Sequence, residues 1–283
     1  MNIDILNPSG FCGGVINVLK LKDYVVETHK DQSIYCVGQV VHNNDVNEQI
    51  LKKGVKVLTI DKKKAVESIE SGVVVFSAHG TDERIVRLAR NKGLIVYNAV
   101  CPFVDKSFEA IKNKHNEGYD IIYIGKKGHD EANAAKSIID NIHFVSNLTD
   151  VELLDINNSK IAIINQTTLS ILDIEYIYKK IQEKYPNAII IDEICNTTRL
   201  RQQNLLKKAK QYDVVIVVGD KSSSNTMSLF NIATKENKNT YMVLNEKDVE
   251  NQWFVNVNSV LIVSGASTPN VEIDKIVKKI KIN

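Results

Sequence analysis

Short runs of Val, Ile and aromatic residues recur along the whole chain without polar alternation. They centre on Ile5, Tyr35, Val57, Val75, Ile95, Ile122, Phe144, Ile163, Ile190, Ile216, Met242 and Ile262. Such runs are typical of parallel strands that are buried on both faces. Helical spacing between them predicts helices over residues 15–28, 106–116, 131–140, 199–211 and 271–280. Strands that alternate with helices predict an α/β fold with right-handed crossovers.

The pattern occurs three times at nearly equal intervals, and each copy contains a cysteine. Cys12, Cys101 and Cys195 each follow an apolar run and precede a helical pattern. Self-similarity at a fixed period indicates a repeated architecture. If each copy opens with the strand before its cysteine, the runs at Ile95 and Ile190 belong with the strands that follow them.

We therefore predict three similar small parallel-sheet α/β units, with boundaries near residues 99 and 193. They cover residues 1–99, 100–193 and 194–283, and we expect a pseudo-threefold, trefoil-like arrangement around a central cavity. The first strand is expected to pair either within the first unit or with the third unit.

Polar side chains follow the predicted strands at matching offsets in the three copies. Ligands of open α/β sheets bind at the carboxyl ends of the strands, so these groups are candidates for one shared site. Neutral donors at helix N-termini can hold a phosphate or diphosphate, whereas N-capping is the alternative role for Ser, Thr and Asn. The candidates are His42, His79, His129, Thr167, Thr168, Ser223, Ser224, Asn225 and Ser267.

The three repeated cysteines are candidate metal ligands. A helix N-terminus favours the thiolate, which is the form that binds metals. Three thiolates can hold zinc together with a His, or an iron–sulfur cluster that normally takes four, in which case one iron stays open to substrate. The alternative is that they pack as small hydrophobic residues, which is the role we expect for Cys36 within the apolar run 34–37.

Composition excludes several classes of partner. The formal net charge of +2 argues against a nucleic-acid-binding protein, which carries a concentrated basic face. The apolar runs are too short to cross a membrane, and the N-terminal residues do not resemble a secretory signal. We therefore expect a cytoplasmic protein with neither a nucleic-acid nor a membrane partner. In that compartment cysteines are more often metal-binding or catalytic than disulfide-bonded.

Three function classes remain open on these residues alone. The first is an iron–sulfur reductase that acts on a small phosphorylated compound. The second is a zinc-dependent hydrolase, and the third is a metal or anion sensor without catalytic activity. Glu131 does not decide between them, since its spacing fits an ordinary first-turn residue favoured by the helix dipole.

Nine spaced segments resemble the LytB family of 4-hydroxy-3-methylbut-2-enyl diphosphate reductases, over the whole chain. They occur in family order and comprise 10–15, 41–43, 77–80, Cys101-Pro102, 128–131, 166–170, 195–198 with Arg201-Gln202, 221–225 and 265–267. The chain departs from the family pattern at Asn98, Val100, Asp130, Ala134 and Glu193.

The resemblance implies a [4Fe–4S] cluster that Cys12, Cys101 and Cys195 hold, with one open iron for the substrate hydroxyl. It implies that Glu131, with Thr167 and His129, passes a proton to the leaving hydroxyl. The expected reaction is a two-electron reductive dehydroxylation of an allylic diphosphate, with electrons from an external donor such as ferredoxin or flavodoxin. The implied substrate-binding residues are His42, His79, His129, Thr167, Thr198, Ser223, Ser224, Asn225 and Ser267.

Overall fold

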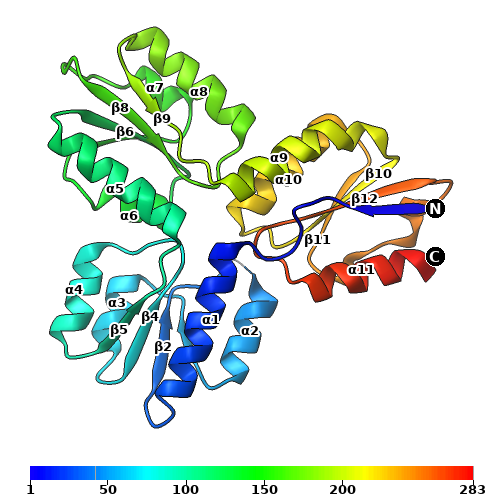
Figure 1. Cartoon of the computed structure of the whole chain (residues 1–283), viewed down its shortest axis with the longest axis horizontal. Helices are drawn as coiled ribbons and strands as arrows, with labels where there is room; N and C mark the ends of the chain where they lie inside the picture. Colours follow the sequence, from blue (N-terminus) through cyan, green and yellow to red (C-terminus); the bar gives the residue numbers. More distant parts are fainter. Residues whose placement is uncertain (42, 283) are drawn as a thin grey trace. The chain divides into compact units, whose positions relative to one another are not determined.

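Three four-stranded parallel sheets form the framework of the computed structural model, which describes residues 1–41 and 43–282 (Figure 1). Every apolar run named above is a strand. The predicted α/β class with three small parallel sheets is therefore confirmed.

Each sheet contains four strands, which follow in their spatial order. The first is formed by β3 (Lys56–Leu58), β2 (Ile34–Val37), β4 (Val73–Phe76) and β5 (Ile95–Asn98). The second is formed by β7 (Ile142–Val145), β6 (Asp120–Ile124), β8 (Ile161–Asn165) and β9 (Ile189–Ile191). The third is formed by β11 (Thr240–Val243), β10 (Val214–Val218), β12 (Ser259–Ser264) and β1 (Asn2–Ile5).

All three sheets share one strand order. In each sheet the chain makes an inner strand, then an edge strand, and then crosses over to the second inner strand. The last edge is the strand that precedes a cysteine: β5, β9 and, in the third sheet, β1. The N-terminal strand thus pairs with the third sheet, where Ile3 lies opposite Val260. The grouping of Ile95 and Ile190 with the strands that follow them is wrong, because each completes the sheet before its cysteine.

The helices follow the strands closely. They are α1 (Gly13–Thr28), α2 (Asn44–Lys52), α3 (Lys62–Ser68), α4 (Glu83–Asn91), α5 (Pro102–Asn116), α6 (Asp130–Lys136), α7 (Leu148–Glu152), α8 (Ile171–Lys184), α9 (Asn196–Lys208), α10 (Ser224–Glu236) and α11 (Asn270–Ile282). Three short 3₁₀ helices are η1 (Ala209–Gln211), η2 (Glu246–Asp248) and η3 (Asn251–Phe254).

The predicted helix boundaries need small corrections. Helix α5 begins earlier than predicted because Pro102 occupies its first turn, where its missing N–H costs nothing. Helix α6 ends at Lys136, short of the predicted residue 140. Helix α9 begins at Asn196, and the predicted end near residue 211 is reached by the 3₁₀ helix η1.

Each sheet buries its own apolar core. In the third sheet Val214, Ile216 and Ile262 pack against the α11 side chains Ile273 and Ile276. Figure 1 shows α9 and α10 on one face of this sheet and α11 on the other. Because both faces are covered, the inner strand β10 is apolar and buried along its whole length, which is the pattern that the sequence displays.

The chain divides into two compact units. One contains Met1–Val15, Asn43 and the chain from Cys195 onward, and therefore the third sheet. The other contains Ile16–Val41 and Asp45–Ile194, and therefore the first two sheets. The predicted boundaries near residues 99 and 193 fall between β5 and α5 and between β9 and α9, and the three-unit division stays a prediction. In the described residues we find no helix of the length and apolar character that a membrane span needs.

Candidate functional site

Each of the three repeated cysteines directly precedes a helix. Cys12 comes before α1, while Cys101 and Cys195 are the N-cap residues of α5 and α9. The Cys12 Sγ accepts a hydrogen bond from the Val15 N–H at 3.5 Å, and the Cys195 Sγ accepts one from the Thr198 N–H at 3.4 Å. Free N–H groups and the helix dipole both favour a thiolate at this position. All three thiols are half-buried and free of disulfides.

Two of these cysteines make equivalent backbone hydrogen bonds. The Cys12 N–H donates to the carbonyl of Ala266 at 3.0 Å, and the Cys101 N–H donates to the carbonyl of Ala78 at 2.9 Å. Ala266 follows β12 and Ala78 follows β4, which are equivalent inner strands of their sheets. In two of the three copies, the repeat therefore extends from the strand order down to an individual hydrogen bond of the cysteine turn.

A buried arginine holds the turn that carries Cys12. The Arg201 guanidinium, which is 1% exposed, donates to the carbonyls of Gly10 and Ser264. Gly10 adopts a φ of +70°, and a Cβ there would clash with the Asn270 side chain. Burial lowers the pKa of Arg201 to about 10, and the charges of the Cys12 and Cys195 thiols oppose that shift. The Arg201 cation therefore interacts electrostatically with both of these cysteines.

Cys36 differs from the other three. It lies in β2 and is 1% exposed, and burial raises the pKa of its thiol to about 12. A thiol that stays protonated in an apolar core is neither a metal ligand nor a nucleophile. Its predicted role in core packing agrees with this position.

Glu131 is fully buried and bonded to Thr167. Its carboxylate accepts the Thr167 N–H at 2.7 Å and the Thr167 Oγ1–H at 2.9 Å. Burial raises the pKa of Glu131 to about 7, against these hydrogen bonds, which lower it. Glu131 lies in the first turn of α6, as its spacing predicts. An ordinary first-turn residue that the helix dipole stabilises would be exposed, whereas Glu131 is buried. A carboxyl with a pKa near neutrality is suited to giving and taking a proton.

Two histidines lie beside this carboxyl group in the same unit. His129 caps α6, where its Nδ1 accepts the Glu131 N–H at 3.2 Å. Its ring meets the His79 ring edge to face, with 5.6 Å between the ring centroids. His79 follows β4, and His129 follows β6 in the neighbouring sheet. The structure thus brings together four of the predicted residues: His79, His129, Glu131 and Thr167.

The other unit carries Thr198 and the predicted Ser and Asn residues. Ser223 is the N-cap of α10, and its hydroxyl accepts the Thr226 N–H at 3.3 Å. Ser223 therefore caps the helix, which is the alternative role for such residues. Its hydroxyl still has a hydrogen that it can donate to an anion. Thr198, Ser224, Asn225 and Ser267 are also buried. His42 lies outside the described residues.

Asn225 has an unsatisfied buried amide. It is 3% exposed, and neither its Oδ1 nor its Nδ2 has a hydrogen-bond partner among the described residues. A buried polar group without a partner costs about 1–3 kcal/mol. Because Asn225 lies in the first turn of α10, its amide could bind an anion at the helix N-terminus.

Within each sheet, the inner strands position the predicted site residues. His79 follows β4, Thr167 follows β8, Ser223 follows β10 and Ser267 follows β12. The two inner strands of each sheet are adjacent, and the order in which strands are added to the sheet reverses between them. Ligands of open α/β sheets bind beyond the carboxyl ends of the strands at this point.

Sequence reasoning missed several partners of the predicted residues. Asn43 donates its Nδ2–H to the Ser267 carbonyl at 2.9 Å. The Lys62 Nζ binds the Gly80 carbonyl, next to His79, and the Asp130 carboxylate, next to His129. Tyr123 is buried in β6, and both burial and the charge of Glu131 raise its pKa. Asn43 and Arg201 stand inside segments that resemble the family, which was the available signal. Lys62 stands in a run of three lysines, a pattern typical of solvated surface.

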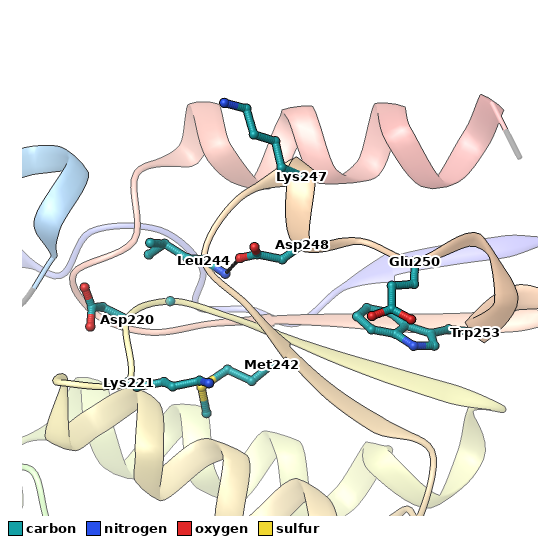
Figure 2. Close-up of a pocket in the computed structure, with 9 residues that line it drawn as sticks. Asp220, Lys221, Met242, Leu244, Lys247, Asp248, Glu250 and Trp253 are labelled. Atoms are coloured by element: carbon teal, nitrogen blue, oxygen red, sulfur yellow. Dashed lines mark hydrogen bonds between the residues drawn. The ribbon is translucent and has the colours of Figure 1, made fainter.

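A separate pocket lies at the carboxyl ends of β10 and β11, within the third sheet (Figure 2). It has a volume of about 620 Å³, and its lining includes Asp220, Lys221 and Trp253. Trp253 stacks on Tyr241 with 4.2 Å between the ring centroids. None of the predicted site residues lines this pocket.

Neither unit holds a complete metal site by itself in the part of the chain that the structure describes. No group of three His, Cys, Asp or Glu side chains among the described residues is arranged to hold a metal ion. Cys12 and Cys195 belong to one unit and Cys101 to the other. A site with all three thiolates therefore needs both units.

Comparison with known proteins gives one consistent family. The family model described as LytB protein matches residues 3–281. Curated relatives named 4-hydroxy-3-methylbut-2-enyl diphosphate reductase, from Halalkalibacterium halodurans and a Geobacillus species, are 36% and 37% identical over 275 residues. Each match covers 95% of this chain and 87% of the relative.

Solved structures agree with this result. The E-1-hydroxy-2-methyl-but-2-enyl-4-diphosphate reductase of Plasmodium falciparum superposes with a TM-score of 0.91 at 32% identity, covering 98% of this chain and 87% of that one. A second structure is described as (E)-4-hydroxy-3-methyl-but-2-enyl diphosphate reductase, the terminal enzyme of the non-mevalonate pathway. It gives a TM-score of 0.73 at 28% identity over the whole of both chains. With its repeated cysteine turns and its buried Glu131–Thr167 pair, this chain belongs to the LytB family.

Proposed function

We propose that this chain reduces 4-hydroxy-3-methylbut-2-enyl diphosphate to isopentenyl and dimethylallyl diphosphates, the last step of the non-mevalonate isoprenoid pathway. The observation that carries the proposal is the environment of Glu131. This residue is fully buried and bonded to Thr167, and burial raises its pKa to about 7. Loss of a hydroxyl group as water requires a proton, and this carboxyl can supply it near neutral pH.

LytB reductases are iron–sulfur enzymes. We infer that Cys12, Cys101 and Cys195 hold a [4Fe–4S] cluster, which would supply the electrons and an open iron for the substrate hydroxyl. The donor set fits, because each thiol lies at a helix start and the Arg201 cation interacts electrostatically with two of the three cysteines. The proposal requires the three sheets to face one central cavity with their carboxyl ends, in the pseudo-threefold arrangement that the sequence predicts.

The diphosphate group of the substrate would be held by neutral donors and histidines. The unpartnered amide of Asn225 and the helix start at Ser223 and Ser224 supply hydrogen bonds without a full positive charge. His79 and His129 add ring N–H donors, which carry charge only when protonated. The full proposed set is His42, His79, His129, Thr167, Thr198, Ser223, Ser224, Asn225 and Ser267.

Proton delivery would use groups within one unit. Glu131 accepts both bonds from Thr167, so the Thr167 hydroxyl is oriented with its hydrogen toward the carboxylate. His129 fixes the first turn of α6 by capping the Glu131 N–H. The two electrons would come from an external donor such as ferredoxin or flavodoxin.

Metal analysis combined with turnover tests this proposal. Protein purified without oxygen is expected to be brown, to contain iron and sulfide, and to convert the substrate with a strong artificial reductant. A colourless protein that contains zinc and no sulfide would identify a hydrolase instead. A protein that binds diphosphate but turns nothing over would be a sensor on the same framework.

Substitution of Asn225 by Leu is expected to separate binding from stability. The free energy of unfolding should stay unchanged or rise, because the variant removes a buried amide without partners. The KM for the substrate should rise by about 10- to 200-fold, the equivalent of one or two lost hydrogen bonds. Ser228→Ala, one turn further along α10 and also buried, is the matched control and should leave KM unchanged. Equal KM values for Asn225→Leu and the wild type would remove Asn225 from the binding set.

A further inference from the structure

We propose that Lys62 is a positioning residue for the two histidines of the site, an assignment that rests on the proposed function. Its Nζ binds the Asp130 carboxylate at 3.0 Å, the Gly80 carbonyl at 3.1 Å and the Thr81 hydroxyl at 3.3 Å. An ammonium group has three hydrogens, and these three partners account for all of them. All of these contacts lie within one unit.

The partners of Lys62 are neighbours of the proposed diphosphate ligands. Gly80 directly follows His79, and Asp130 directly follows His129. The two loops come from different sheets, and the histidine rings meet at 5.6 Å. Lys62, at the start of α3, therefore ties together the two backbone segments that set the distance between the rings.

The surroundings keep the Lys62 side chain in one place. It is only 15% exposed. Gly38, with a φ of +84°, leaves room for it, since a Cβ at that position would lie 3.2 Å from the Lys62 Cε. At Gly80, also at +84°, a Cβ would lie 2.6 Å from the Phe108 ring. The backbone at Gly38 therefore packs directly against the Lys62 side chain, and the backbone at Gly80 packs against Phe108 too closely for a larger residue.

The charge balance points to positioning rather than to direct binding of substrate. Asp130 neutralises the Lys62 ammonium at 3.0 Å, so the pair brings little net charge to an anionic ligand. An ordinary surface ion pair contributes about 0–1 kcal/mol to stability and holds no other group in position. This pair also holds a carbonyl beside His79, and small displacements of binding groups weaken substrate binding and turnover strongly.

The test compares Lys62→Met with the matched control Lys63→Met. Lys63 is the next residue of α3 and is 67% exposed. Two measurements are made on each protein: calorimetric affinity for inorganic diphosphate, and KM and kcat for the substrate with an artificial reductant. Lys62→Met is expected to weaken affinity and raise KM about tenfold while kcat falls less than about threefold. Lys63→Met should match the wild type.

A third measurement does not depend on catalysis. Carbethoxylation of His79 and His129, followed by mass spectrometry, reports how tightly the two loops are held. Both histidines should react faster in Lys62→Met than in the wild type or in Lys63→Met. Lys62→Arg, which keeps the cation, should restore most of the affinity and protection. Asp130→Asn should act like Lys62→Met, and the double variant should be no worse than either single variant.

The outcomes separate this inference from the proposed function. If the wild type binds diphosphate and turns over substrate, but Lys62→Met keeps wild-type affinity and histidine reactivity, the positioning role is wrong. A lower melting temperature alone, with unchanged affinity, would also overturn it, because that is what a purely structural ion pair predicts. If the wild type is inactive, the proposed function fails, and the carbethoxylation rates still decide the role of Lys62.

Discussion

Replacement of Cys101 by Ser is expected to yield a folded protein that cannot retain its iron–sulfur cluster. Hydroxyl oxygen is a poor ligand for a cluster that thiolates hold, so bound iron and sulfide should fall well below the wild-type content. Turnover should fall by more than the roughly 10- to 100-fold that is typical of losing an outer partner of a metal ligand. Iron and sulfide analysis with a visible spectrum, on protein kept free of oxygen, measures the effect.

The position of Cys101 makes this experiment clean. Cys101 is the N-cap of α5, and Ser is among the preferred residues there, so the helix should not lose stability. The backbone bond from residue 101 to the Ala78 carbonyl is independent of the side chain. Cys36→Ala is the control: this cysteine is buried in β2, and its loss should leave the cluster intact. A complete cluster in Cys101→Ser would contradict the three-thiolate proposal.

Glu131→Gln is expected to lower kcat by about 10²- to 10⁴-fold with little change in substrate affinity. The amide keeps an oxygen that can accept the Thr167 N–H, so the local structure should persist. It has no proton to give, so only the chemical step is affected. Steady-state kinetics with an artificial reductant measure the change, and Glu175→Gln, an exposed carboxylate of α8 in the same unit, is the control. Unimpaired turnover in Glu131→Gln would exclude this residue as the proton donor.

The raised pKa of Glu131 also gives stability a distinct pH dependence. Its value is about 7 in the folded protein, against 4.5 as the ordinary value. Between these values the folded state binds a proton that the unfolded state has lost. The free energy of unfolding should therefore fall as pH rises from 4.5 to 7, by roughly 3 kcal/mol in total, and stay level above pH 7 as far as this group is concerned.

Glu131→Gln isolates this contribution, since the amide does not titrate. The difference in free energy of unfolding between the variant and the wild type should grow in favour of the variant as pH rises from 4.5 to 7. Denaturant titrations at several pH values measure it. A difference that does not vary with pH would mean that Glu131 titrates normally. The same ionisation should lower wild-type kcat above about pH 7, where the proton is lost.

The sequence predicted the positions of the strands better than their pairing into sheets. Apolar runs marked all the strands, and most clearly the inner strands, which are covered on both faces and carry no polar alternation. Pairing is a long-range property, and counting from the cysteines grouped Ile95 and Ile190 with the wrong sheets. The strand order places these runs at the far edges of the preceding sheets, which spacing along the chain does not encode.

The candidate site residues were named from the sequence, whereas the contacts that support them could not be predicted. Glu131 and Thr167 were named from a resemblance, and spacing alone gave no reason to expect a buried carboxyl. Arg201 and Lys62 act through contacts with residues far away in the sequence, such as Gly10 and Asp130. A charged residue in a hydrophilic stretch looks like surface until the fold shows which loop it reaches.

The pairing of β1 with β12 has a consequence for the order in which the protein is made. During synthesis Asn2–Ile5 is made before the other strands described here, yet its partner strand, Ser259–Ser264, is made after all of them. The other two sheets draw all their strands from residues 34–191 and can form before that. Cys101 finds its anchor, Ala78, already made, whereas Cys12 must wait for Ala266. The first of the three thiols to leave the ribosome is therefore fixed in place only after the other two have been made.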